Sequence, residues 1–254
     1  MSSLSPAERI LIGLGITEPK DIDLEAIAWS RGAAVRYRQL ENCEAMIVGS
    51  QRRAIITVNN SSIFVRRRFS LAHEIGHWHH HRGRILFCGS REIDNPANSA
   101  LNPEHQADIF ASDLILPDYL FRPRAARLKR VTLSAARELA GEFNASLTAT
   151  LLKLVKGNSF PILVVCHNEQ RRRWFHSAPM LPGWWFPREE LDAESFAFEM
   201  LFGSAAESSF PRKVGAGAWF DFRNADRYEI QEQSFLLPNQ EVLTVLTIPE
   251  EGLG

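Results

Sequence analysis

The chain has few cysteines and no long hydrophobic segment. Its 254 residues include three cysteines, an odd number, at the widely spaced positions Cys43, Cys88 and Cys166. This set does not suit a disulfide framework and is typical of a reducing compartment. No stretch approaches the ~20 apolar residues of a membrane span, and the first residues lack the basic start and apolar run of a signal peptide. We therefore expect a cytoplasmic protein.

The chain also lacks an excess of charge of one sign. The formal net charge is −1, so no global basic field would attract nucleic acid. Charge is nevertheless uneven: seven arginines and one acid lie between Arg52 and Arg84, and six basic residues and no acid between Tyr119 and Arg137. Neither a P-loop nor a nucleotide-binding glycine fingerprint occurs. Solvated surface explains these patches, although they would also attract an acidic substrate.

The most informative stretch is the pattern H-E-x-x-H formed by His73, Glu74 and His77. Ser70 predicts an N-cap ahead of a run with apolar periodicity, so we expect a helix. Four residues turn a helix by about 400°, and both histidines can therefore reach one zinc ion. Glu74 is placed to take a proton from zinc-bound water. Gly76 is unfavourable inside a helix and predicts close approach of another backbone, such as a strand edge.

A second segment, residues 102–117, offers a third ligand. Proline near its start and at its end predicts a helix between them. Glu104 and Asp108 are four residues apart and share one face. We expect Glu104 to complete a His-His-Glu zinc site with one open position, and Asp108 to accept the free N–H of a ligating histidine. The alternatives are an H-E-x-x-H pattern that arose by chance and a first-turn acid that interacts with the helix dipole.

The two segments together resemble the ImmA/IrrE family of zinc metallopeptidases. The resemblance rests on R-R-F-S-L-A-H-E-I-G-H and on E-x-x-A-D-x-F-A-x-x-L-I-L-P, within a block that covers residues 50–120. It implies a small zincin-like peptidase domain with His73, His77 and Glu104 on zinc and with Glu74 catalytic. It also implies a protein substrate, commonly a helix-turn-helix repressor or an antitoxin.

The remaining pattern predicts an α+β protein of three parts: a zincin-like metallopeptidase domain (1–130), a helix-turn-helix-like segment (131–157) and a C-terminal α+β domain of unknown role (158–254). Short helices (5–15, 23–31) and strands (34–37, 45–48, 54–58) should precede the motif. We place residues 54–59 at the edge of this small sheet, where they can pair with an extended substrate. The connection 82–101 is expected to be a loop beside the cleft, and the histidines at 79–81 an exposed helix end.

The predicted helices at 133–143 and 147–156 resemble a helix-turn-helix unit. In a DNA-binding version, the second helix would enter the major groove, where Thr150 and Lys153 would contact DNA. Because that helix lacks several arginines or asparagines, packing or docking of a repressor substrate is the preferred interpretation. The C-terminal domain should hold one helix at 188–202. Its five expected strands are 160–166, 172–176, 213–220, 227–236 and 241–248. Its tryptophans 184, 185 and 219 suit a core, or the wall of a pocket.

We therefore predict an intracellular zinc endopeptidase. A DNA-binding regulator with a structural or sensory zinc is the alternative from another class, and a toxin held by an antitoxin shares the chemistry. Three ligands with an open position favour catalysis, because closed structural sites usually have four. Tyr119 or the arginines at 66–68 are candidates for stabilising the oxyanion. We expect no membrane partner, and the sequence leaves the oligomeric state open.

Overall fold

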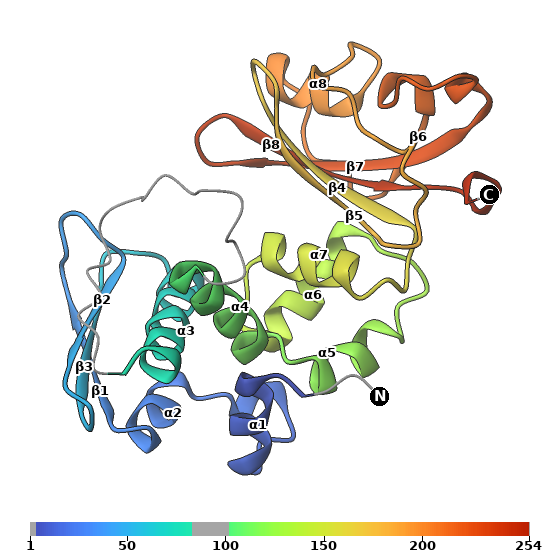
Figure 1. Cartoon of the computed structure of the whole chain (residues 1–254). Coiled ribbons are helices and arrows are strands. Elements are labelled where there is room, and N and C mark those ends of the chain that lie inside the picture. The colour runs from blue at the N-terminus through green and yellow to red at the C-terminus, as the bar shows by residue number, and fades with distance from the viewer. Residues whose placement is uncertain (1–3, 83–101, 254) are drawn as a thin grey trace. The chain divides into compact units, whose positions relative to one another are not determined.

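The computed structural model describes residues 4–82 and 102–253, and this part of the chain is α+β, with eight α-helices and two β-sheets (Figure 1). It divides into two compact units. The first comprises the chain up to Pro123 together with Ala140–Ser146, and the second comprises Arg124–Leu139 with Leu147–Gly254. Apart from Arg82, the predicted loop at 82–101 lies outside the described residues. The division into three domains remains a prediction.

The first unit begins with two short helices and a three-stranded sheet, all close to their predicted positions: α1 (Pro6–Gly13), α2 (Leu24–Ser30), β1 (Ala33–Arg38), β2 (Ala45–Gly49) and β3 (Ala54–Asn59). β3 lies between the other strands, parallel to β1 and antiparallel to β2. Its placement at the sheet edge was therefore wrong. The burial of Ala54, Ile56 and Val58 on one face would also suit an edge strand; β3 is central because β1 pairs with one of its sides and β2 with the other.

The motif lies on α3 (Phe64–His80), as expected, but this helix starts earlier than predicted. Ile63 precedes its first residue without a side-chain cap, and Ser70 is buried inside the helix. The N-cap assignment of Ser70 was therefore wrong. Three consecutive arginines at 66–68 are good helix formers, so the helix extends toward its N-terminus through them.

The second ligand segment forms α4 (Pro103–Ile115), whose N-cap Asn102 accepts a hydrogen bond from the N–H of Glu104 at 2.9 Å. α4 packs against α3 at Gly76. A Cβ atom on Gly76 would lie 3.0 Å from Cα and 3.1 Å from the carbonyl oxygen of Ala107. The prediction of a close backbone is confirmed, but the backbone belongs to a helix rather than a strand. This contact holds α4 alongside the motif helix.

After α5 (Asp118–Ala125), helices α6 (Leu133–Phe143) and α7 (Leu147–Lys156) have their predicted bounds. Thr132 caps α6 by accepting a hydrogen bond from the N–H of Ala135. α7 packs against the sheet of the second unit. Thr150 is 0% and Lys153 is 7% exposed, so neither of these side chains is presented to a DNA groove.

The second unit contains a five-stranded antiparallel sheet in the order β5-β4-β8-β7-β6. Its elements are β4 (Ile162–Asn168), β5 (Arg172–Ser177), α8 (Phe196–Phe202), β6 (Arg212–Gly215), β7 (Glu229–Leu237) and β8 (Glu241–Thr247). α7 and α8 cover opposite faces of this sheet (Figure 1). Trp185 and Trp219 are core residues, whereas Trp184 is exposed.

Two elements of the second unit are shorter than predicted. The helix expected at 188–202 forms only over α8, because Ser195 caps it and the preceding residues make turns. The strand expected at 213–220 ends at Gly215, where a 3-10 turn (Ala216–Ala218) begins. None of the helices in the described part of the chain has the length and apolar character needed to cross a membrane.

Candidate metal centre

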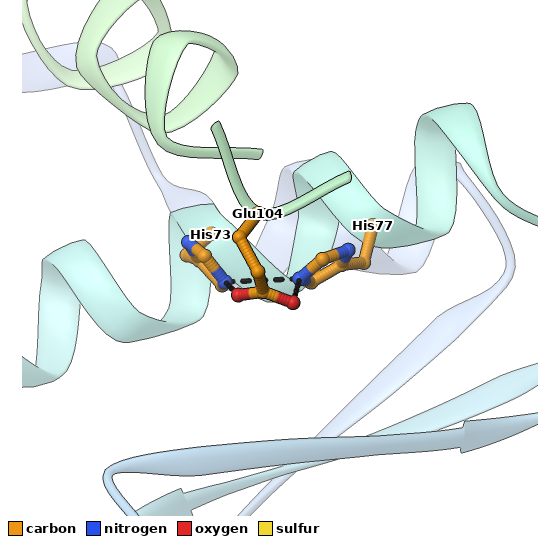
Figure 2. A group of neighbouring side chains, drawn as sticks. All are labelled: His73, His77 and Glu104. Atoms are coloured by element: carbon orange, nitrogen blue, oxygen red, sulfur yellow. Dashed lines mark hydrogen bonds and ion pairs between the residues drawn. The ribbon is translucent and has the colours of Figure 1, made fainter. Parts of the chain in front are cut away.

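Helices α3 and α4 bring three potential ligand atoms together (Figure 2). The Nε2 atoms of His73 and His77 are 2.9 Å apart. One carboxylate oxygen of Glu104 lies 3.2 Å from Nε2 of His73, and the other lies 3.2 Å from Nε2 of His77. The three side chains predicted as ligands therefore meet at one point, where α4 crosses the motif helix.

This spacing fits a metal ion. Two ligand atoms bound 2.0–2.1 Å from zinc at the tetrahedral angle are about 3.3 Å apart, close to the separations between the ring nitrogens and the carboxylate. Two imidazole nitrogens with one carboxylate oxygen also form a donor set typical of zinc sites that keep an open position. The group of His73, His77 and Glu104 could therefore hold a metal ion.

Asp108 lies at its predicted position, beside the ring nitrogen of His73 that faces away from Glu104. Its Oδ1 is 2.8 Å from Nδ1 of His73, and Asp108 is one helical turn after Glu104 on α4. Burial by itself lowers the pKa of His73, but the hydrogen bond and the charge of Asp108, together with the charges of Glu74 and Glu104, raise that pKa above its usual value. The carboxylate of Asp108 favours a proton on Nδ1 of His73, and Nε2 faces Glu104 and His77.

His77 has a different environment because it is 1% exposed. Burial, followed by the charge of His73, lowers the pKa of His77 to about 4. The ring is therefore neutral at pH 7, which is the state that offers a lone pair to a metal. Its Nδ1 has no hydrogen-bond partner among the residues that the structure describes.

Glu74 follows His73 directly on α3 and is 2% exposed. Its side chain points about 100° around the helix from that of His73, so it is not part of the group of three converging ligands. It lies near enough for its charge to raise the pKa of His73. Glu74 is thus a buried carboxylate next to a candidate ligand in the sequence, and its role as a base stays a prediction.

The candidates for oxyanion stabilisation are not brought to this group. The hydroxyl of Tyr119 donates to the carbonyl of Ile16 at 2.7 Å. Arg67 lies over the ring of Tyr37, and Arg68 donates to the carbonyl of Ile22 at 3.4 Å. These contacts join elements of the first unit to one another.

The histidines that follow the motif are less exposed than predicted. His79 is half-buried and stacks on Phe110 of α4, with ring centroids 5.1 Å apart. Nδ1 of His79 lies 3.4 Å from the guanidinium of Arg31. The ring of His81 is 5.6 Å from that of His77. Only His80 is exposed. The reason is packing of α4 along the end of α3, which spacing within the motif does not reveal.

A helix that carries H-E-x-x-H, packed on a small sheet and facing an acidic side chain from a second helix, defines a zincin-like metallopeptidase fold. The model of the peptidase M78 family, described as the IrrE N-terminal-like domain, matches residues 25–155, which is more than half of the chain. The chain belongs to this family, and the resemblance seen in its sequence is confirmed.

No curated protein matches the chain. Among solved structures, it is similar to a transcriptional regulator from Mycobacterium tuberculosis, with a TM-score of 0.60 and 14% identity, over 96% of this chain and 86% of that one. At this identity the likeness concerns the fold alone.

Proposed function

We propose that the protein is a zinc endopeptidase that cleaves one specific protein partner. The observation that carries the proposal is the convergence of His73, His77 and Glu104, with Asp108 on the far nitrogen of His73. Membership of the peptidase M78 family supports metallopeptidase chemistry in general. Three protein ligands leave one position for water or substrate, which is the arrangement of catalytic zinc sites.

Each of these side chains has a distinct task. When bound, zinc would polarise the scissile carbonyl and lower the pKa of a bound water. Glu74 would act as the general base toward such a water and as the general acid toward the leaving amine. Asp108 holds the proton of His73 on Nδ1, which keeps Nε2 free to bind the metal. The burial of His77 keeps its ring neutral and able to ligate.

β2 is the strand on which we expect an extended substrate to pair. It lies at an edge of the sheet and, in the part of the chain that the structure describes, it pairs only with β3. It also packs against α3, whereas the other edge strand, β1, packs against α2. A substrate strand added to β2 would gain main-chain hydrogen bonds beside the motif helix. Ala45–Gly49 would then select an extended, accessible segment of the partner.

The partner that we propose is a helix-turn-helix repressor or an antitoxin in the cytoplasm. Its cleavage would relieve repression of the genes that it controls. Direct reading of DNA is a weaker alternative. The structurally similar protein is named a transcriptional regulator, which is compatible with either function. Thr150 and Lys153, which would have to reach the bases, are buried. The toxin hypothesis uses the same chemistry on another target.

The test combines the purified chain, loaded with zinc, with a helix-turn-helix protein, chosen from an adjacent reading frame if one is encoded there. Partner size is followed over time by mass spectrometry. Wild type should make one discrete cut, and a chelator should stop it. Glu74→Gln should bind the partner and leave it whole, because an amide cannot accept the proton and loss of a general base costs about 10²–10⁴-fold in rate.

Two results would count against the proposal. Cleavage by Glu74→Gln at the wild-type rate would show that Glu74 is not the base. An intact partner after incubation with zinc-loaded wild type would show that this partner is not the substrate.

A further inference from the structure

The first unit contains a second potential site, a cavity of about 440 Å³ beside α1 and the last residues of α2 and α3. Figure 1 shows α1 and α2 close to the helices that carry the metal group. Its lining includes Arg9, Arg31 and His79, together with apolar side chains of α1. The volume falls within the range of about 300–1,000 Å³ that is usual for small-molecule sites.

The charge of this cavity is of one sign. Arg9 and Arg31 line it, and the guanidinium of Arg82 donates to the carbonyl of Arg31 at 3.1 Å. Among the residues that the structure describes, no acidic side chain lines the cavity. In the described part of the chain, neither Arg9 nor Arg31 forms an ion pair, since Arg9 donates to the carbonyl of Leu4 and Arg31 contacts His79. Neighbouring cations without a counter-charge repel one another, and a bound anion would relieve that repulsion.

Interaction with a helix dipole explains the position of only one of these two arginines. Arg31 is the C-cap of α2, where a cation interacts favourably with the helix dipole. Arg9 lies in the middle of α1 and has no such role. Its side chain nevertheless reaches the same cavity. The presence of Arg9 and Arg31, from two segments of the chain, in the lining of one cavity therefore needs another reason.

Beside this basic part, the lining has an apolar part that includes Pro6, Ile10 and Leu14. Leu14 is 47% exposed, although it is a large apolar side chain. A ligand that combined a charged head with a short apolar chain would satisfy both parts. Carboxylates and phosphates are the heads that guanidinium groups bind best, because two N–H donors can face two oxygens.

We propose that this cavity binds a small organic anion, with a carboxylate or phosphate head against Arg9 and Arg31 and an apolar chain along Ile10 and Leu14. The site is distinct from the metal centre. His79 follows His77 by two residues, so their side chains point about 200° apart around α3. The inference does not depend on peptidase activity.

The experiment is isothermal titration of the full-length protein with four probes: hexyl phosphate, hexanoate, inorganic phosphate and hexanol. We expect saturable binding of hexyl phosphate, hexanoate or both, at least about tenfold tighter than inorganic phosphate or hexanol, because only these probes use both parts of the cavity. Comparison of the two anionic amphiphiles identifies the preferred head. Binding should weaken as salt is raised.

Arg9→Gln and Arg31→Gln should each weaken that binding by about tenfold to a hundredfold, the usual effect of losing a charge-assisted hydrogen bond. Arg36→Gln, on the exposed part of β1, is the matched control and should leave the Kd unchanged. Circular dichroism melting checks that each variant is folded. Equal affinity for hexanol and hexyl phosphate, wild-type affinity in both pocket variants, or no saturable binding by either amphiphile would overturn the proposal.

Discussion

Oδ1 of Asp108 lies 2.8 Å from Nδ1 of His73, on the side of the ring away from Nε2 and Glu104. One turn of α4 thus supplies a carboxylate to each nitrogen of the same imidazole. The two acids have different positions and therefore different tasks: Glu104 faces the converging ligand atoms, and Asp108 fixes the tautomer of the ring. This relationship leads to the first test of the metal centre.

Asp108→Ala should weaken zinc binding by about 10–100-fold without abolishing it, the usual effect of losing a partner behind a ligating histidine. The measurement is competition with a chromophoric chelator. His105→Ala is the matched control, because His105 is exposed on the same helix next to Glu104. It should bind zinc like wild type. An unchanged affinity for Asp108→Ala would remove Asp108 from the site.

Glu104→Ala, His73→Ala and His77→Ala should each lose tight zinc, because two remaining ligands hold a divalent ion poorly. Elemental analysis after dialysis gives the metal content. Full stoichiometry in Glu104→Ala would mean that the third ligand comes from elsewhere, and the geometry of α4 would need another explanation.

Gly76→Ala tests whether the contact of α3 with α4 positions Glu104. The new Cβ would meet Cα of Ala107 at 3.0 Å and Cβ of Phe110 at 3.2 Å, so the helices must shift. We expect a loss of about 1–3 kcal/mol in unfolding free energy, as for other overpacked sites, and weaker zinc binding. Gly141→Ala in α6 is the control, because its Cβ would meet nothing within 4 Å. It should stabilise by about 0.5–1 kcal/mol. Equal stability of the two variants would contradict this account.

The meeting of His73, His77 and Glu104 could be predicted in part because the spacing of residues within a helix is local information. A four-residue spacing places two side chains on one helical face whatever the rest of the chain does, which held for His73 and His77 and again for Glu104 and Asp108. Two of the wrong predictions concern relations between segments. Whether β3 is central depends on the chain returning from β2, and the environment of His79 depends on Phe110 of α4. The predicted N-cap at Ser70 was wrong because serine also occurs inside helices, and α3 begins before it.

The last prediction concerns the second unit, where Glu232 of β7 is buried beneath α8. Burial raises the pKa of its carboxyl, while four hydrogen bonds oppose this shift. All four are donated to it: one oxygen accepts from the N–H of Ala197 at 2.7 Å and the hydroxyl of Ser234 at 3.2 Å. The other accepts from the N–H of Phe196 at 3.2 Å and the indole of Trp219 at 2.8 Å.

Glu232→Gln replaces one of these acceptor oxygens with an NH₂ group, which can only donate. In either orientation of the amide, the two protein donors that faced that oxygen lose their acceptor. Because an unsatisfied buried polar group costs about 1–3 kcal/mol, we expect a loss of about 2–4 kcal/mol in unfolding free energy. Urea unfolding followed by tryptophan fluorescence measures it, since Trp219 contacts the carboxylate directly. Glu229→Gln on the same strand removes only an exposed ion pair with Lys213, and its effect should stay below about 1 kcal/mol. If both variants unfold at the wild-type urea concentration, Glu232 does not anchor α8 to the sheet.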